Sequence, residues 1–439
     1  MRRRHYYVSK FNYSYNQDLF PRDVAGDSRL PQPPRSSSNP QAARNASITA
    51  QNAAPNPIVA AAAELPPPSF HVDVAIAGGG LAGLALAAGL QARGIEVAVF
   101  EAAAAARRSN NSTGTILGIF PNGFKALEGL KPGLGDAVIA SGADIAEEGG
   151  AVQQQRKVVV VRAKILVAAD GVRSAVRNQM IGDSPRYLEQ FGWNARVPSQ
   201  LSGEASQQEN RTVLSFKDAV TGYQMFFIDG GKTFWLVSAA DPDGKLKAEL
   251  EQTPFGGFGK PGVKDRLMCH VSKNIADPSA HDTWHTVLQA VTTTDPGNIY
   301  ERWMMDRPPP KDSWSDSKCG SRVVLMGDAA HAMHPELGQG AQTAFEDAHQ
   351  LSLCLADIKD GLAEPAAVAA AVREYEDRRI DRCVRIHAYA TAAHGFGEEA
   401  KLVKDLSPPE KRKLFMEFQK WILAYPDKIK GDPESTYFK

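Results

Sequence analysis

Three glycines with GxGxxG spacing follow an apolar run near the start of the ordered-looking sequence. Gly78 allows a tight turn, Gly80 lets the backbone approach a pyrophosphate, and Gly83 allows a helix to pack closely on the preceding strand. Glu101 ends the next apolar run, about 20 residues further on, where an acidic side chain binds a ribose hydroxyl. The spacing predicts a dinucleotide site, and the carboxylate favours FAD or NAD over NADP.

Two later apolar runs also end in Asp and Gly. The run at 165–169 leads into Asp170 and Gly171, a pattern that by itself fits the end of almost any strand. A second run leads into Gly327 and Asp328. Here a strand is expected to deliver an aspartate to a glycine-punctuated helix start.

The sequence after Asp328 predicts another helix N-terminus. Pro335 is followed by Gly338, Gln339 and Gly340, and then by a helical pattern through Leu355. The first N–H groups of a helix have no partner within the helix and carry partial positive charge. This segment is therefore expected to bind an anion or an electron-rich ring.

The surrounding pattern indicates how these motifs are positioned. From His71, short apolar runs alternate with helical stretches, which is typical of a parallel sheet with crossover helices. Three β-rich runs, Arg211–Lys217, Gly222–Asp229 and Lys232–Ala240, predict an antiparallel meander. From Pro365 the chain reads as amphipathic helix. We therefore expect four regions: a leader at 1–70, a nucleotide-binding domain at 71–184 and 300–365, a substrate domain at 185–299, and a helical region at 366–439.

The leader has an unusual composition. Residues 1–70 contain ten of the 28 prolines and seven arginines, with no Asp or Glu between Asp27 and Glu64. An Arg-rich, Ser-containing, acid-poor segment is typical of an organelle transit peptide, so a plastid or other organelle is expected. The alternative is an ordinary disordered extension of a cytoplasmic protein.

Composition excludes several classes of partner and site. The 439 residues include 50 basic and 50 acidic ones, so no long-range field attracts nucleic acid. The four cysteines form no CxxC pair, and neither a zinc site nor a disulfide framework is expected. The longest apolar run, 74–90, is broken by glycines and is interpreted as strand, turn and helix rather than a transmembrane segment. A small organic molecule is the expected partner.

All three motifs, in this order, resemble the FAD-dependent monooxygenases that include salicylate hydroxylase, p-hydroxybenzoate hydroxylase and zeaxanthin epoxidase. The resemblance implies an α/β fold: a Rossmann-type FAD-binding domain with an inserted antiparallel β-sheet substrate domain and C-terminal helices. It also implies that Asp328 binds the ribityl chain and that 338–340 faces the flavin pyrimidine ring. Asp170 and Gly171 would lie near the pyrophosphate and assist the nicotinamide donor, and Pro335 would border the substrate side of the ring.

The activity that this resemblance implies is oxygenation. NAD(P)H would reduce FAD, O₂ would add as a C4a-hydroperoxide, and one oxygen atom would hydroxylate or epoxidise a small or isoprenoid-like substrate. The hard step belongs to the cofactor, so no catalytic acid or base and no metal ligand is named.

The interval 102–169 departs from the family pattern because it is shorter than usual. The arginine-containing helix that contacts FAD in the family is not found there, and Arg108 is the candidate for a flavin contact. Two alternatives therefore stay open: a flavin oxidase or dehydrogenase, and a non-catalytic FAD-binding remnant.

Overall fold

The structure is a computed structural model, and it describes the chain in segments. The described residues are 70–102, 117–140, 161–198, 212–216, 222–228, 232–250, 256–275, 288, 290–393 and 406–426. The leader before Phe70, Arg108 and much of the interval 102–169 therefore lie outside the described residues, and the expectations about them stay predictions.

A four-stranded parallel sheet has the strand order β10-β3-β1-β2. Its strands are β1 (Phe70–Ala77), β2 (Val97–Phe100), β3 (Val161–Ala168) and β10 (Val323–Leu325). Ala77 at the end of β1 pairs with Phe100 of β2 and with Ala168 of β3. Since parallel strands end at the same edge, the Gly78 turn, the Asp170 turn and the Gly327 turn all leave the sheet side by side. This arrangement confirms the expected Rossmann-type fold.

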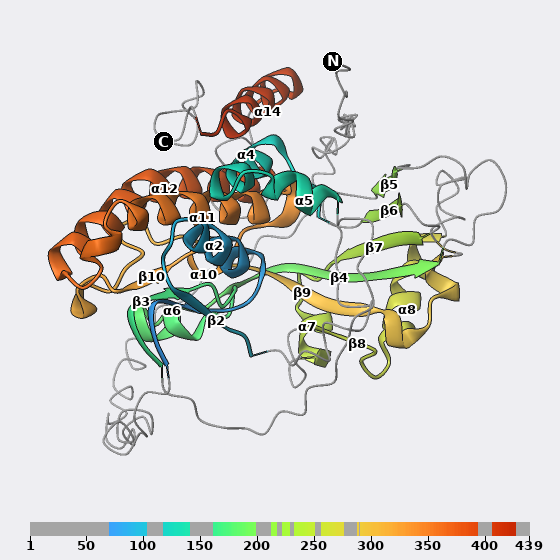
Figure 1. Ribbon diagram of the computed structural model, residues 1–439. Helices are drawn as coiled ribbons and strands as arrows, with labels where there is room; N and C mark the ends of the chain where they lie inside the picture. Colours follow the sequence, from blue (N-terminus) through green and yellow to red (C-terminus); the bar gives the residue numbers. More distant parts are fainter. Residues whose placement is uncertain are drawn as a thin grey trace, which may run out of the picture.

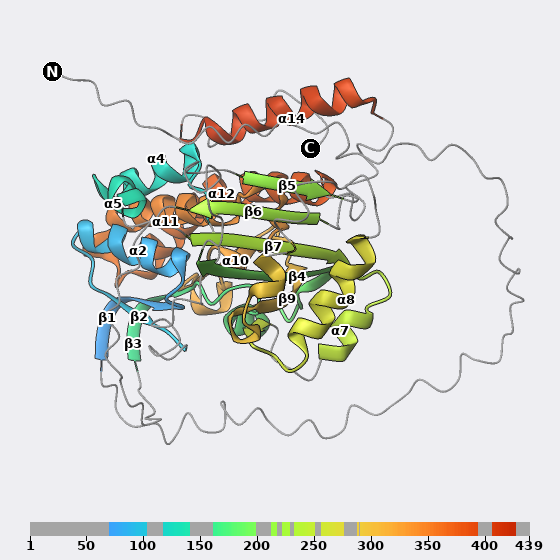
Figure 2. The same ribbon diagram turned by 90° about the vertical axis from the view of Figure 1, so that its right-hand side faces the viewer.

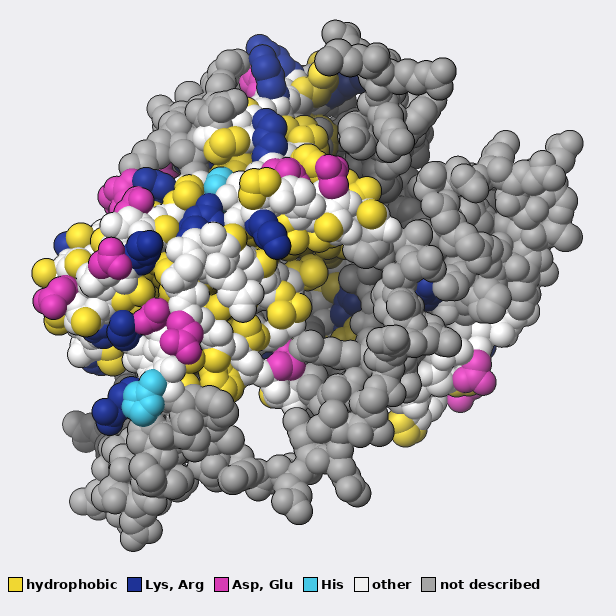
Figure 3. Space-filling model, viewed as in Figure 1, with side chains coloured by type: hydrophobic (Ala, Val, Ile, Leu, Met, Phe, Trp, Pro, Cys, Tyr) yellow, Lys and Arg dark blue, Asp and Glu magenta, His cyan; other side chains and the backbone are white. Residues whose placement is uncertain are grey.

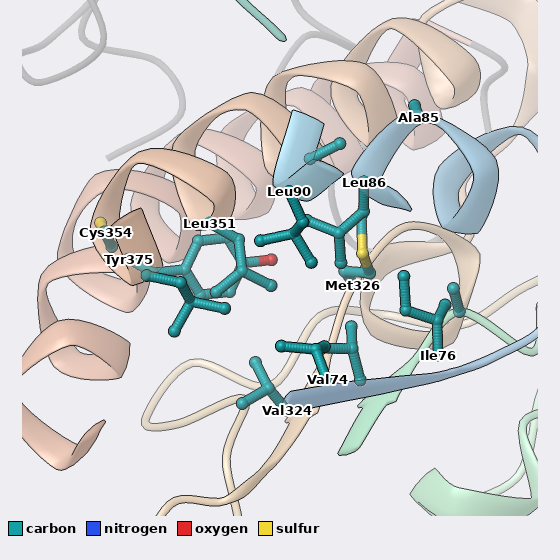
Figure 4. Packing of buried hydrophobic residues seen from close by; sticks show 14 of the residues in the cluster. Val74, Ile76, Ala85, Leu86, Leu90, Val324, Met326, Leu351, Cys354 and Tyr375 are labelled. Carbon is teal, nitrogen blue, oxygen red and sulfur yellow. The ribbon is translucent and has the colours of Figure 1, made fainter. Parts of the chain in front are cut away.

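Helices cover this sheet and build the main core (Figure 1). They are α2 (Leu81–Ala92), α4 (Pro121–Leu130), α11 (Gly340–Ala356) and α12 (Pro365–Ala393), with the short α5 (Leu134–Ala140) beside α4 and α6 (Ala175–Met180) after β3. Val74 of β1, Leu86 and Leu90 of α2, and Leu351 of α11 pack together with the Tyr375 ring (Figure 4). Truncating such a buried leucine to alanine typically costs about 2–5 kcal/mol.

A six-stranded antiparallel sheet has the order β5-β6-β7-β4-β9-β8. Its strands are β4 (Arg186–Pro198), β5 (Thr212–Phe216), β6 (Gly222–Ile228), β7 (Lys232–Ala240), β8 (Gly256–Phe258) and β9 (Tyr300–Asp306). The three β-rich runs form the predicted meander. The helices α7 (Lys245–Leu250) and α8 (Val263–Ile275) lie along one face of this sheet (Figure 2).

The second part of the expected nucleotide-binding region begins at residue 300, but the strand that starts there belongs to the antiparallel sheet. β9 pairs with β4 and β8. Its alternation of side chains could fit either sheet, and only pairing with β4 decides between them.

The C-terminal helices form a third cluster. α14 (Pro408–Leu423) begins with a capping box in which Ser407 and Glu410 satisfy each other's backbone groups. Phe418 of α14 stacks on Tyr389 of α12 with ring centroids 4.1 Å apart. No helix in the described part of the chain is both long and apolar enough to cross a membrane. Over the described surface in Figure 3, charged side chains of both signs are interspersed with hydrophobic ones.

Candidate cofactor site

The glycine turn is held in place by its own backbone packing. Gly78 has φ +106°, and a Cβ there would lie 2.2 Å from the Ala169 carbonyl oxygen. A Cβ at Gly83 would lie 2.0 Å from the Gly78 carbonyl oxygen. Both positions must therefore be glycine for β1, β3 and α2 to meet as they do.

Gly80 differs from the other two because the protein itself leaves it open. Its backbone is extended (φ −77°, ψ −172°), and a Cβ there would meet no atom within 4 Å. Gly80 is the N-cap residue of α2, which has neither a side-chain cap nor an acidic residue in its first turn. The space and the partial positive charge at this helix start fit a pyrophosphate.

Glu101 lies directly beside this turn. Its Oε2 accepts a hydrogen bond from the Gly79 N–H at 2.8 Å, and its side chain is exposed. The carboxylate thus lies beside the glycine turn, and its binding of a ribose hydroxyl stays a prediction.

The two carboxylate oxygens of Asp170 have different surroundings. Its Oδ2 accepts the N–H of Ala175 at 2.8 Å and so caps the start of α6. Its Oδ1 is buried and has no hydrogen-bond partner among the described residues. The Asp170 backbone N would lie 3.0 Å from a Cβ on Gly78. Asp170 thus lies at the edge of the glycine turn, its capping role was not expected from the sequence, and its predicted place near a pyrophosphate stays a prediction.

The Gly327–Asp328 motif reaches the same turn from the other side. Gly327 has φ +57°, and a Cβ there would lie 2.9 Å from the Cβ of Ala82 in the first turn of α2. Its N–H donates to Asp347 Oδ2 at 2.9 Å. Asp328 then begins the short helix α10 (Asp328–His331). The structure therefore brings together two motifs that lie about 245 positions apart in the sequence.

The environment of Asp328 indicates a recess. Its side chain is exposed to solvent, yet the protein surrounds it closely enough that desolvation raises the pKa of its carboxyl group above the usual value. The nearby Asp347 carboxylate also raises this pKa, whereas His331 lowers it. A side chain that is accessible and yet closely surrounded lies in a concave part of the surface, which suits a carboxylate that accepts hydrogen bonds from ligand hydroxyls.

The N-terminus of α11 completes this side of the site. Gly338 has φ +61° and packs against Phe120, and the Gln339 side chain accepts a hydrogen bond from Asn122 Nδ2 at 2.9 Å. Pro335, which begins the 3-10 turn η6 (Pro335–Leu337), is exposed. Asn122 was not predicted as a site residue, since nothing local in the sequence of α4 connects it to α11.

Behind these motifs lies a buried charge network. Glu346 Oε2 is 2.7 Å from Arg379 Nη1 and 2.6 Å from Arg382 Nε, and Asp347 Oδ1 is 2.7 Å from Arg379 Nε. Burial alone would raise the pKa of Glu346, but the Arg382 and Arg379 charges outweigh it and lower the pKa. His331 Nε2 lies 2.6 Å from the other oxygen of Asp347. This network fixes α10, α11 and α12 relative to each other, and so positions Asp328 and Gly340.

The same network contains the metal-like grouping His331, Asp347 and Cys383, whose ligand atoms lie within 4.8 Å of one another. Arg379 donates to both Asp347 and Cys383, at 2.7 and 3.3 Å. A guanidinium already supplies the positive charge there, so the geometry gives no reason to place a cation beside it.

The antiparallel sheet contacts this site through polar side chains of β4 and β9. His334 Nε2, in the segment between α10 and η6, lies 2.9 Å from Gln190 Oε1 on β4, and both side chains are buried. A second link joins α12 to β9, where His387 Nε2 lies 3.1 Å from Asp306 Oδ2. The sheet face opposite α8 is thus turned toward the Pro335 segment.

Comparison with known proteins agrees with this geometry. Residues 266–385 match the family model described as "FAD binding domain". The chain is 29% identical to the chloroplastic zeaxanthin epoxidase of Nicotiana plumbaginifolia over 52% of this chain and 31% of that protein. It is 26% identical to the 3-amino-4-hydroxybenzoate 2-monooxygenase of Streptomyces cremeus over 73% of this chain and 86% of that protein. The chain thus spans about a third of the zeaxanthin epoxidase.

Solved structures share the fold. A salicylate hydroxylase substrate complex has a TM-score of 0.52 at 16% identity, covering 81% of this chain and 95% of that one. Klebsiella pneumoniae HpxO complexed with FAD and uric acid has a TM-score of 0.50 at 18% identity, covering 81% and 96%. Together with the glycine turn, Glu101 and the Gly327–Asp328 motif, these findings show that the chain is similar in sequence to FAD-dependent monooxygenases and shares their fold.

Proposed function

We propose that the protein binds FAD along the carboxyl edge of the parallel sheet and uses NAD(P)H and O₂ to hydroxylate or epoxidise an organic substrate. The observation that carries the proposal is the open space at Gly80, at an uncapped helix start whose first turn meets Gly327 through Ala82. The other two glycines are explained by the protein's own packing, whereas Gly80 is explained by a ligand.

The site residues would bind successive parts of FAD along the carboxyl edge of the parallel sheet. The Gly78–Gly83 turn and the start of α2 would hold the pyrophosphate, Glu101 the adenosine ribose, and Asp328 the ribityl hydroxyls. The start of α11 at Gly340 would face the pyrimidine ring, where its partial positive charge suits a carbonyl oxygen that gains electron density on reduction. The Asp170 Oδ1 is a buried acceptor that a ligand hydroxyl or amide can satisfy.

When bound, FAD supplies electron transfer and oxygen activation, so the chain's own task is to bind, orient and exclude water. The buried network around Glu346 and Arg379 keeps the cofactor-facing helix starts rigid. Pro335 and the sheet face that carries Gln190 lie on the side where the substrate would be held. No side chain is assigned a proton-transfer role.

The relatives support this proposal at the level of reaction class. Their names include an epoxidase and an aromatic 2-monooxygenase. Two measurements test the proposal: flavin content of the purified protein, by visible absorption and mass spectrometry, and transfer of ¹⁸O from ¹⁸O₂ to a product. We expect about one FAD per chain and labelled product. Bound flavin with peroxide but without labelled product would show an oxidase, and absence of flavin binding after reconstitution would show a remnant.

An organelle location is a separate part of the proposal. It rests on the acid-poor, Arg-rich residues 1–70 and on relatives whose names describe them as chloroplastic. Fusion of residues 1–70 to a fluorescent reporter tests it in plant cells. A reporter confined to the cytosol would reject the targeting proposal.

A further inference from the structure

One stretch of β4 departs from regular pairing with β9. Tyr187 of β4 pairs with Met305 of β9. The next pair joins Phe191 to Trp303, so β4 advances by four residues where β9 advances by two. The additional residues of β4 form a bulge, which contains Glu189. The φ of Glu189 is +52°, in the left-handed region that costs free energy for a residue other than glycine.

The bulge changes where the Glu189 side chain points. Side chains alternate along a regular strand, so Glu189 would share a face with Tyr187 and Phe191, which both pack in the hydrophobic cluster beside α8. In the structure the Glu189 side chain is exposed instead. The next residue, Gln190, is buried, with 6% of its surface exposed. The left-handed residue thus keeps a carboxylate out of the apolar cluster, and it directly precedes a buried amide.

The amide of Gln190 contacts the segment that leads to Pro335. His334 Nε2 lies 2.9 Å from Gln190 Oε1, and His334 is only 2% exposed. An amide oxygen can only accept, so the imidazole Nε2 carries the proton and donates it. Because both side chains are buried, removal of the acceptor would leave this N–H out of reach of bulk water, which is costly.

The segment before Pro335 is fastened largely from outside the parallel sheet. The Ala332 carbonyl accepts from the backbone N–H of Arg307, the residue that follows β9, at 2.8 Å. Met333 packs in the cluster formed by α12 and α14. His334 then contacts β4. The antiparallel sheet therefore holds the chain on both sides of Met333, immediately before the proposed substrate side of the flavin.

We propose that Gln190 is a positioning residue, which the bulge at Glu189 directs at His334 so that the Pro335 segment stays in place beside the flavin and excludes water when O₂ reacts. Backbone strain persists where the surrounding structure requires it, and bulges near sites redirect side chains. The inference rests on the proposed function and deepens it, because it names the part of the antiparallel sheet that limits loss of oxygen as peroxide. Gln190 acts through His334.

The first test uses the flavin-free protein and hydrogen–deuterium exchange of backbone amides. Gln190→Met keeps the length of the side chain but removes the amide oxygen. Exchange in peptides covering 332–337 should become at least about tenfold faster, whereas peptides from β1 and β3 should change less than about twofold. Gln190→Glu keeps an oxygen acceptor and should restore protection to within about threefold. Glu189→Ala removes an exposed side chain next to Gln190 and is the matched control, which should leave exchange unchanged.

The second test uses the FAD-loaded protein without substrate. The flavin is reduced by light and mixed with O₂, which takes up two electrons and two protons from it and leaves as hydrogen peroxide. Peroxide should form at least about threefold faster in Gln190→Met than in the unmodified protein, because water reaches the flavin more easily. The dissociation constant of FAD should stay within about threefold, and Gln190→Glu should restore slow release. A merely structural role of Gln190 would not change peroxide release.

Three results would overturn the inference: unchanged exchange at 332–337 in Gln190→Met, equally faster exchange throughout the described chain, or faster exchange at 332–337 with unchanged peroxide release. If Gln190→Met does not fold, Gln190→Asn decides the question, because it draws the amide back by one methylene group. Absence of FAD binding by the unmodified protein would count against the proposed function. A flavin-loaded protein whose peroxide release does not respond to Gln190→Met would count only against the role of Gln190.

Discussion

Replacing Gly80 by aspartate should stabilise the protein without cofactor and abolish cofactor binding. The backbone at Gly80 is extended, so any residue can adopt it, and the space for a side chain is open. Aspartate is among the best N-cap residues because its carboxylate accepts the first free N–H groups of the helix. Those same N–H groups are the ones that the pyrophosphate of FAD would use.

The two effects have opposite signs and different sizes. Relative to glycine, a capping side chain contributes a few tenths of a kcal/mol, and a negative charge at a helix start adds about 0.3–1 kcal/mol. The free energy of unfolding should therefore rise by about 0.5–1 kcal/mol in Gly80→Asp. Loss of two charge-assisted hydrogen bonds to the pyrophosphate, each about 1.5–3 kcal/mol, weakens FAD binding by about a hundredfold or more.

Urea unfolding of the flavin-free protein measures the first effect, and titration with FAD followed by flavin fluorescence measures the second. Gly361→Asp is the matched control. It adds the same charge in the 3-10 turn η7 (Lys359–Gly361), near the amino end of β10, where Arg322 contacts the Leu362 carbonyl. FAD affinity within threefold of normal in Gly80→Asp would refute the placement of the pyrophosphate. If flavin-free Gly80→Asp is less stable than the flavin-free unmodified protein, the interpretation of Gly80 as an open N-cap is refuted.

Three further predictions concern buried or enclosed charges. Arg379→Met should lower the free energy of unfolding by about 3–5 kcal/mol, because Glu346 and Asp347 lose a buried partner; urea unfolding checks this, and a loss under 1 kcal/mol would contradict it. Burial and nearby arginines lower the pKa of His349 to about 4. The neutral imidazole therefore contributes stability that is present above pH 6.5 and is lost as the pH falls through 4. In His349→Gln the free energy of unfolding should depend less on pH over this range, by at most about 3 kcal/mol. Desolvation raises the pKa of Asp328, so the flavin-free protein loses stability as the pH rises from 3.8 through that raised pKa; Asp328→Asn should remove this dependence and weaken FAD binding, and an unchanged pH dependence would show that the carboxyl is well hydrated.

Several parts of the cofactor site could be predicted because their requirements are local. The spacing of Gly78, Gly80 and Gly83 encodes a strand, a turn and a helix start within six residues. The alternation of apolar runs with helical segments predicts the parallel sheet, and the three runs between 211 and 240 predict the meander. Asp170, Gly327 and the 338–340 segment could be recognised as strand ends or helix starts for the same reason.

Contacts between residues that lie far apart in the sequence could not be predicted in this way. Glu346 and Asp347 are neutralised by Arg379 and Arg382. These arginines lie on the next long helix, with Arg379 33 and Arg382 36 positions after Glu346, and the local sequence gives no signal for the pairing. The sequence also does not reveal which sheet the strand at 300–306 joins, because its pattern is compatible with both. Its actual place is set by hydrogen bonds to β4.

The sequence by itself therefore determined the local chemistry of the cofactor motifs, since a turn or a helix start depends on the conformations of a few consecutive residues. Only the tertiary structure decided which motifs meet. Gly327 reaches the first turn of α2 because β10 and β1 flank β3, and β9 belongs to the antiparallel sheet because its register matches β4. Both outcomes depend on strand order and register, which are fixed by the packing of the whole chain.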